Sequence, residues 1–197
     1  MKLCEIAKPK PIPTKQLLNH QDIKNWLDEQ GVKNYDIRPN GIVDVDRAAV
    51  DLRKFKGTTL PVQFGKVDGS FWCNMAPLTS LQGSPQEVGH DFWCNNTKIT
   101  SLVGVPQYIG GRFACFQTRK ISLSGIDKMI KYIGGEVSCG KEATHILGLL
   151  LIEGITHFDI DSGGPIDTIF NTYLGTGDIL SAQDELIDAG LIDQARL

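Results

Sequence analysis

The chain has 197 residues, of which 41% are hydrophobic and 22% are charged, and its formal net charge is −3. This balance is typical of a soluble globular domain or of a short repeat array with a continuous core. The slight overall acidity argues against a strong general affinity for polyanions. The longest apolar run, residues 146–152, is far shorter than the roughly 20 residues that span a bilayer, so we expect no membrane partner.

The N-terminal residues carry lysines but no apolar stretch typical of a secretory signal. The five cysteines include no CxxC pair, and their odd number fits free thiols in a reducing compartment better than a disulfide framework. We therefore expect a cytoplasmic protein.

The first part of the chain predicts a helix followed by a hairpin. In NHQDIKNWLDEQG, residues 19–31, Asn19 is a suitable N-cap, apolar residues recur on one face, and Gly31 ends the helix. Asn40-Gly41, between the strand-like stretches YDIR and IVDV, is a strong hairpin-turn signal. We expect residues 1–45 to form an N-terminal cap.

A period of 21 residues governs the middle of the chain. Several columns share it: Cys73, Cys94 and Cys115; Phe71, Phe92 and Phe113; Leu60, Leu81, Leu102 and Leu123; Val67, Val88 and Ile109; Gly83, Gly104 and Gly125. Such a fixed period indicates a solenoid, in which each coil buries its apolar side chains against its neighbours. Within one coil, GxxFxCxxTxI (residues 89–99) is similar to the leucine-rich-repeat pattern, with Thr97 in place of the usual asparagine.

The period then lengthens to 24 residues, and the later segments predict caps. SGIDKMIKYIGG has helical spacing, and short strands are expected at residues 137–139 and 158–160. Helical patterns follow at residues 142–152, 165–174 and 178–189, the last closed by Gly190. The predicted fold class is α/β: a short leucine-rich-repeat-like solenoid with a parallel sheet over residues 46–140, and helical caps in residues 1–45 and 141–197.

The repeat ITSLxGxPxxVGGxFxC, preceded by LPxxFGKVDGSF, resembles the leucine-rich-repeat-like proteins encoded by large tailed bacteriophages. The C-terminal stretch from LLGLLLIEGITHFDID to GDILSAQDELIDAGLIDQARL resembles the segment that those proteins share. The resemblance implies a small protein that is made inside an infected bacterium and acts by binding.

Alternation along the strands predicts which side chains face the solvent. If Phe92 and Cys94 point inward, Trp93 points outward, onto the sheet that lines the inner curve. The same register predicts an exposed column of Asp51, Trp72, Trp93, Ala114 and Ser138, with two further exposed columns beside it. The binding surface that we predict consists of Trp72, Trp93, Phe116, Arg112, Asn74, Asn95 and Asp91. The alternative is that an end helix covers the tryptophans and makes them part of the core.

No pattern in the sequence predicts catalysis or a cofactor. The cysteine column is best explained by buried thiols, since a linear ladder does not supply four tetrahedral zinc ligands. The four histidines share no spacing, and Asp159 and Asp161 lack the further oxygen ligands that Ca²⁺ needs. We expect no metal, no cofactor and no enzyme activity.

Charge is unevenly distributed and leaves one alternative function open. From Ile155 onward eight acidic residues face a single arginine, whereas basic residues gather in the later coils: Lys98, Arg112, Arg119, Lys120, Lys128, Lys131 and Lys141. Basic side chains beside exposed aromatics could hold single-stranded nucleic acid.

Our leading hypothesis is a noncatalytic protein–protein interaction module. From the resemblance, the expected partner is a host or bacterial defence protein that the chain inhibits or redirects. Self-association through the tryptophans is a further possibility.

Overall fold

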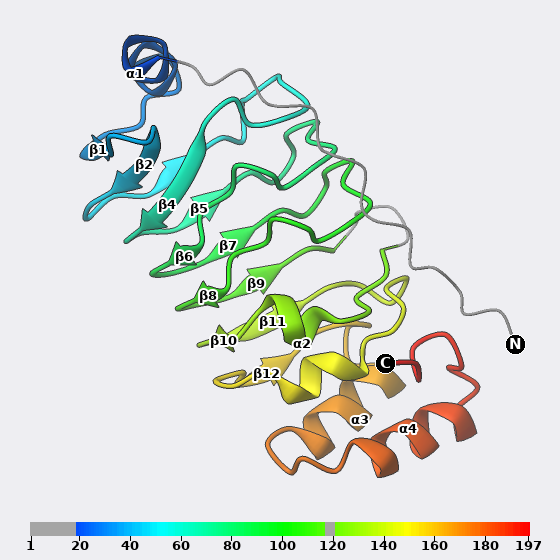
Figure 1. Cartoon of the computed structure of the whole chain (residues 1–197). Helices are drawn as coiled ribbons and strands as arrows, with labels where there is room; N and C mark the ends of the chain where they lie inside the picture. The colour runs from blue at the N-terminus through cyan, green and yellow to red at the C-terminus, as the bar shows by residue number, and fades with distance from the viewer. Residues whose placement is uncertain (1–18, 117–120) are drawn as a thin grey trace, which may run out of the picture.

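A computed structural model describes residues 19–116 and 121–197. The chain winds into a stack of coils with a helix at one end and a pair of helices at the other, which confirms a short α/β repeat solenoid (Figure 1). No helix in the described ranges combines the length and the apolar character that a membrane crossing requires.

Each coil contributes to two sheets rather than to the single sheet that the leucine-rich-repeat pattern suggests. We call them sheet A, in the order β1-β2-β4-β6-β8-β10, and sheet B, in the order β12-β11-β9-β7-β5-β3. The strands of sheet A are β1 (Tyr35–Ile37), β2 (Ile42–Val45), β4 (Gln63–Val67), β6 (Glu87–Val88), β8 (Tyr108–Ile109) and β10 (Tyr132–Ile133). Those of sheet B are β3 (Val50–Asp51), β5 (Phe71–Trp72), β7 (Phe92–Trp93), β9 (Phe113–Ala114), β11 (Glu136–Ser138) and β12 (His157–Phe158).

The 21-residue period appears directly as strand register. Phe71 pairs with Phe92 and Phe92 with Phe113 in parallel, and Val88 pairs with Ile109 in the same way. The longer period also holds, because Val137 pairs with Phe113, 24 residues earlier. All neighbouring strands run parallel except β1, which forms the predicted antiparallel hairpin with β2.

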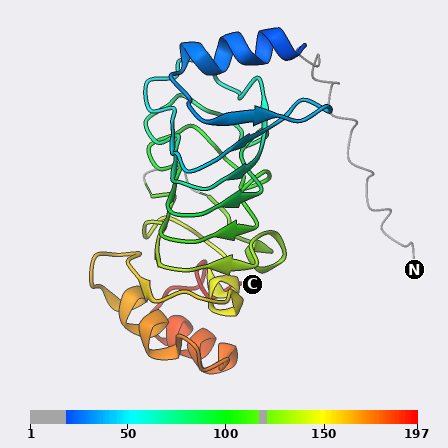
Figure 2. The ribbon, with the colours of Figure 1, turned by 90° about the vertical axis from the view of Figure 1, so that its left-hand side faces the viewer.

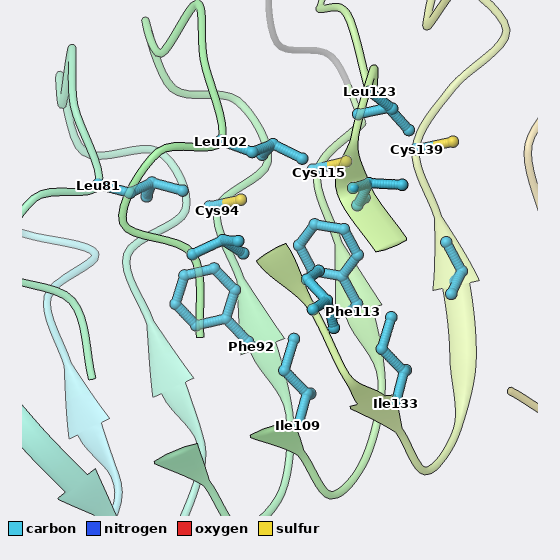
Figure 3. Close-up of a cluster of buried hydrophobic side chains, with 14 of the residues drawn as sticks. Leu81, Phe92, Cys94, Leu102, Ile109, Phe113, Cys115, Leu123, Ile133 and Cys139 are labelled. Atoms are coloured by element: carbon cyan, nitrogen blue, oxygen red, sulfur yellow. The ribbon is translucent and has the colours of Figure 1, made fainter. Parts of the chain in front are cut away.

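The core is a set of ladders in which identical or similar residues stack from coil to coil. The rings of Phe71 and Phe92 stack at a centroid distance of 5.8 Å, and those of Phe92 and Phe113 at 6.2 Å. Leucine, isoleucine and cysteine side chains form parallel ladders beside them (Figure 3). The side chains of Phe92 and Cys94 are fully buried, which confirms the inward positions predicted for them.

Helix α1 (His20–Glu29) closes the first coil, as predicted. The Asn19 side chain accepts a hydrogen bond from the amide of Asp22 and caps the helix. The ring of Trp26 lies 5.7 Å from Phe55 and 6.3 Å from Phe64, so α1 covers the open end of the stack (Figure 2).

The C-terminal end is closed by α3 (Pro165–Tyr173) and α4 (Ile179–Asp188), both predicted. The rings of Phe170 in α3 and Phe158 in β12 meet edge to face at 5.1 Å. Around the start of α3, the Asp161 side chain accepts hydrogen bonds from the backbone amides of Ile166 and Asp167, both at 3.1 Å. The Asp167 side chain accepts in turn from the amides of Asp161 at 3.3 Å and Gly163 at 2.6 Å. These carboxylates therefore form part of a helix cap.

Two predicted helices are shorter than expected. The stretch SGIDKMIKYIGG forms only α2 (Ile126–Met129) before β10 begins. The segment 142–152 forms only the 3₁₀ helix η1 (Leu147–Leu151). Most of its apolar side chains are buried, and they point to several sides of the segment. The segment is therefore part of the core, whereas an amphipathic helix would pack on the core along one face.

Candidate functional site

The outer surface of sheet B carries the residues predicted to bind a partner. Trp72 in β5 and Trp93 in β7 are register partners and are half-buried, whereas the preceding phenylalanines are fully buried. Strand alternation therefore places the two indoles side by side on the solvent side of the sheet. In the structure the end helices cap the stack and leave both indoles half-exposed.

Trp72 has a cationic neighbour. The guanidinium carbon of Arg53 lies 5.2 Å from the centroid of the Trp72 ring, a cation–π contact. Arg53 is held there by Asp51, whose Oδ2 lies 2.7 Å from Nη2. The hydrogen bond from Arg53 keeps the pKa of Asp51 below its usual value, so this ion pair is formed at neutral pH.

Asn74 and Asn95 differ from the expectation of exposure. Asn74 is 7% exposed and Asn95 is 4% exposed. The strands β5 and β7 end at the tryptophans, and the residues that directly follow the two asparagines, Met75 and Asn96, have positive φ angles of 65° and 57°. Because the backbone turns there, strand alternation no longer applies to the two asparagines.

The predicted exposed columns also end earlier than expected. Ala114, the register partner of Trp93, is 1% exposed, and Ser138 is 4% exposed. The displayed surface of sheet B is therefore centred on the coils of β3, β5 and β7.

Asp91 and Arg112 are engaged within the protein. Asp91 accepts a hydrogen bond of 2.9 Å from the backbone amide of Arg112 and so holds the turn between two coils. The Arg112 guanidinium lies 2.6 Å from Glu136 and 3.7 Å from Asp159. This arginine thus pairs with acidic residues of the later coils, which reduces its availability for phosphate groups.

Phe116 and Arg112 line a cavity of about 680 Å³ at the C-terminal end of sheet B. Acidic side chains, Glu142, Asp159 and Asp161, line it as well, with Lys141 as a second cation. A cavity of this size falls in the range of ligand pockets, but its mixed charges select no single ligand class.

Four buried polar atoms without a hydrogen-bond partner belong to this surface. They are Asn74 Oδ1, Trp93 Nε1, Asn95 Oδ1 and Arg112 Nε. Only one further atom of this kind occurs among the described residues, Ser84 Oγ. The buried polar atoms without a hydrogen-bond partner are therefore concentrated at the predicted site. Buried polar groups are nearly always paired, and such a concentration needs an explanation.

The basic residues of the alternative hypothesis are distributed over both sheets. Lys98 and Lys141 follow strands of sheet B, whereas Lys128 and Lys131 lie beside β10 of sheet A. Arg119 and Lys120 lie outside the described residues.

The thiols belong to the core, as predicted. Burial raises the pKa of Cys73 to about 12 and places the pKa values of Cys94, Cys115 and Cys139 well above the usual range. The described part of the chain has no cluster of three or more histidine, cysteine or acidic side chains suited to a metal ion. One serine–histidine contact is present, between Ser122 Oγ and His145 Nδ1 at 3.3 Å, but within the described ranges no carboxylate side chain accepts a hydrogen bond from this imidazole.

Sequence reasoning missed the surface of sheet A. Tyr108 and Tyr132 are register partners on this sheet and are 48% and 40% exposed. The signal was present in the Val67, Val88 and Ile109 column. That column marks a second strand in every coil, whereas the leucine-rich-repeat pattern accounts for one.

Comparison of the chain with family models, with curated proteins and with solved structures found no match. Membership of the phage repeat family stays a prediction from the sequence.

Proposed function

We propose that the chain is a noncatalytic protein-interaction module and that the outer surface of sheet B is its recognition surface. The observation that carries the proposal is the pair of half-exposed indoles, Trp72 and Trp93, which lie side by side on sheet B. A surface that displays two large aromatic rings gains apolar burial when a partner docks on it.

The partner that we propose is a bacterial host or defence protein in the cytoplasm of an infected cell, whose activity the chain inhibits or redirects. This part rests on the resemblance of the repeat to phage proteins. Aromatic pairs of this kind are typical of protein interfaces, where tryptophan is enriched among residues that dominate affinity.

The first experiment is a pulldown from bacterial lysate, with and without nuclease, that compares the wild type with the Trp72→Ala/Trp93→Ala double variant. The matched control is Tyr108→Ala/Tyr132→Ala, which removes two exposed aromatics from sheet A. We expect a protein that survives nuclease, is lost with the tryptophan variant and is retained by the tyrosine variant. Circular dichroism must show that both variants are folded.

A second variant separates recognition from stability. Trp93→Phe keeps an aromatic ring but offers a smaller apolar surface, so affinity for the captured protein should fall by less than in the double variant. The free energy of unfolding should change little, because Nε1 of Trp93 makes no hydrogen bond to a described residue in the folded protein. Equal capture by all variants would contradict the proposal, and capture that disappears with nuclease would favour single-stranded nucleic acid.

A further inference from the structure

A groove runs beside sheet A, on a different part of the coils from the tryptophans. It encloses about 550 Å³ and extends from the Asn40-Gly41 hairpin turn to Lys128 and Met129 of α2. Its floor includes Gly83 and Gly104, which occupy the same position in successive coils with φ angles of 94° and 96°. A Cβ on Gly104 would collide with the backbone carbonyl of Leu81, so glycine at this position lets the two coils stack closely.

The length of the groove suits an extended chain. From Gly41 to Lys128 it crosses five successive coils, which are four steps of about 4.8 Å, or about 19 Å in total. An extended peptide advances about 3.3 Å per residue, so about six residues fill this length.

The groove floor has a gap in its hydrogen bonding, caused by two prolines. The backbone amides next to the prolines donate hydrogen bonds to carbonyl groups of the preceding coil. Gln86 N–H donates to the Gly65 carbonyl at 2.7 Å, and Gln107 N–H donates to the Gln86 carbonyl at 2.8 Å. Pro85 and Pro106, in the column beside them, have no N–H to offer to the coil before.

The first half of this gap is repaired within the chain. Gln63 donates its Nε2–H to the carbonyl of Phe64 at 2.8 Å and to that of Ser84 at 2.9 Å, replacing the donor that Pro85 lacks. One coil later Ser84 stands in the position of Gln63. It is 3% exposed, and its Oγ is buried without a partner among the described residues. No described side chain therefore replaces the hydrogen-bond donor that Pro106 lacks.

The lining selects the class of ligand. The described residues that line the groove include amide side chains and apolar side chains but no aromatic ring, so a base or sugar finds no surface to stack on. Lys128 is their single charged member and lies at one end. A peptide backbone supplies amide donors and acceptors along its length, and a carboxylate can meet the lysine.

We propose that this groove binds an extended peptide segment of about six residues, uncharged in its middle, with a carboxylate at the Lys128 end. The site is separate from the surface of sheet B, and the proposal does not depend on the function assigned to that surface.

The test uses a pool of synthetic octapeptides of random sequence with free C-termini, selected on the full-length protein and sequenced. We expect enriched peptides with an acidic residue or the C-terminus at one fixed end. For the best peptide, Gln86→Trp, which places an indole in the groove, should abolish binding. Gln21→Trp on α1 is the matched control and should bind like the wild type.

Two conservative variants make the test specific. Ser84→Ala should weaken the best peptide about tenfold and leave thermal stability unchanged or raised, because it removes a buried unpaired hydroxyl. Lys128→Gln should weaken it up to about fivefold, as expected for an exposed charge pair. The Trp72→Ala/Trp93→Ala variant should bind the peptide normally. No enrichment by the wild type, or equal binding by Gln86→Trp, would overturn the proposal.

Discussion

At the scale of single residues, the buried thiols give the clearest chemical expectation. Cys73, Cys94, Cys115 and Cys139 lie in the stack with raised pKa values caused by burial. At pH 8 these groups hold their protons in the native protein, so they lack the thiolate that attacks thiol reagents.

We predict that a Cys4→Ser variant, which leaves only these four cysteines, reacts negligibly with a chromogenic disulfide reagent at pH 8 while native. In guanidinium chloride all four should react. A thiol that reacts rapidly with the reagent in the folded protein would contradict the burial of these four cysteines.

The same thiols predict a pH dependence of stability. An unfolded cysteine loses its proton near its ordinary pKa of 9.0, whereas Cys73 in the fold does so near 12. Between these values the unfolded state has fewer bound protons, so the free energy of unfolding decreases as pH rises. Below about pH 9 this contribution is fully present.

Single residues also show where sequence reasoning stopped. The inward Phe92 and Cys94 and the outward Trp93 follow from alternation over one short strand. The same rule predicts an exposed Asn95, which is buried because the backbone turns after only two strand residues. The strands are only two residues long because of the way the coils pack on one another. A local sequence pattern carries no information about that packing.

At the scale of elements, the turns between the sheets depend on glycine for a steric reason. Gly89, Gly110 and Gly134 stack in one column, and each donates its amide to the coil before, as in Gly110 N–H to the Val88 carbonyl at 2.8 Å. A Cβ on Gly110 would collide with the carbonyl oxygen of Gly89. The coils touch here through backbone alone.

We predict that Gly110→Ala lowers the free energy of unfolding by about 1–3 kcal/mol, as overpacking does. At an unstrained position the same change commonly stabilises by reducing the entropy of the unfolded chain, so the sign is diagnostic. Urea unfolding would measure it, with the exposed Gln107→Ala in the same coil as control. A stabilised Gly110→Ala protein would show that the turn is looser than described.

Element boundaries were predictable where capping chemistry marks them. Asn19 and Gly31 delimit α1, and Asp178 caps α4 by accepting from the Ser181 amide at 3.1 Å. The stretch before η1 offers no such marker, and its apolar run is compatible with several conformations until neighbouring coils surround it. Its prediction as a long helix was accordingly wrong.

At the scale of the whole molecule, the repeat period was enough to predict the solenoid, its parallel strands and its capped ends. The number of sheets was not predictable in the same way, because the similarity to leucine-rich repeats accounts for only one strand per coil. The groove beside sheet A could not be foreseen either. It arises from positions that are distant in sequence and adjacent only after stacking.

The even spacing of the coils has a mechanical consequence. Hydrogen bonds between coils run along the axis of the stack, so a force that pulls α1 away from the C-terminal helices loads one row of bonds at a time. In optical-trap experiments the chain should peel open in regular low-force steps. Each 21-residue coil should release about 7 nm of contour length, and the 24-residue coil about 8 nm. A single rip of the full length would instead show that the whole stack yields as one unit.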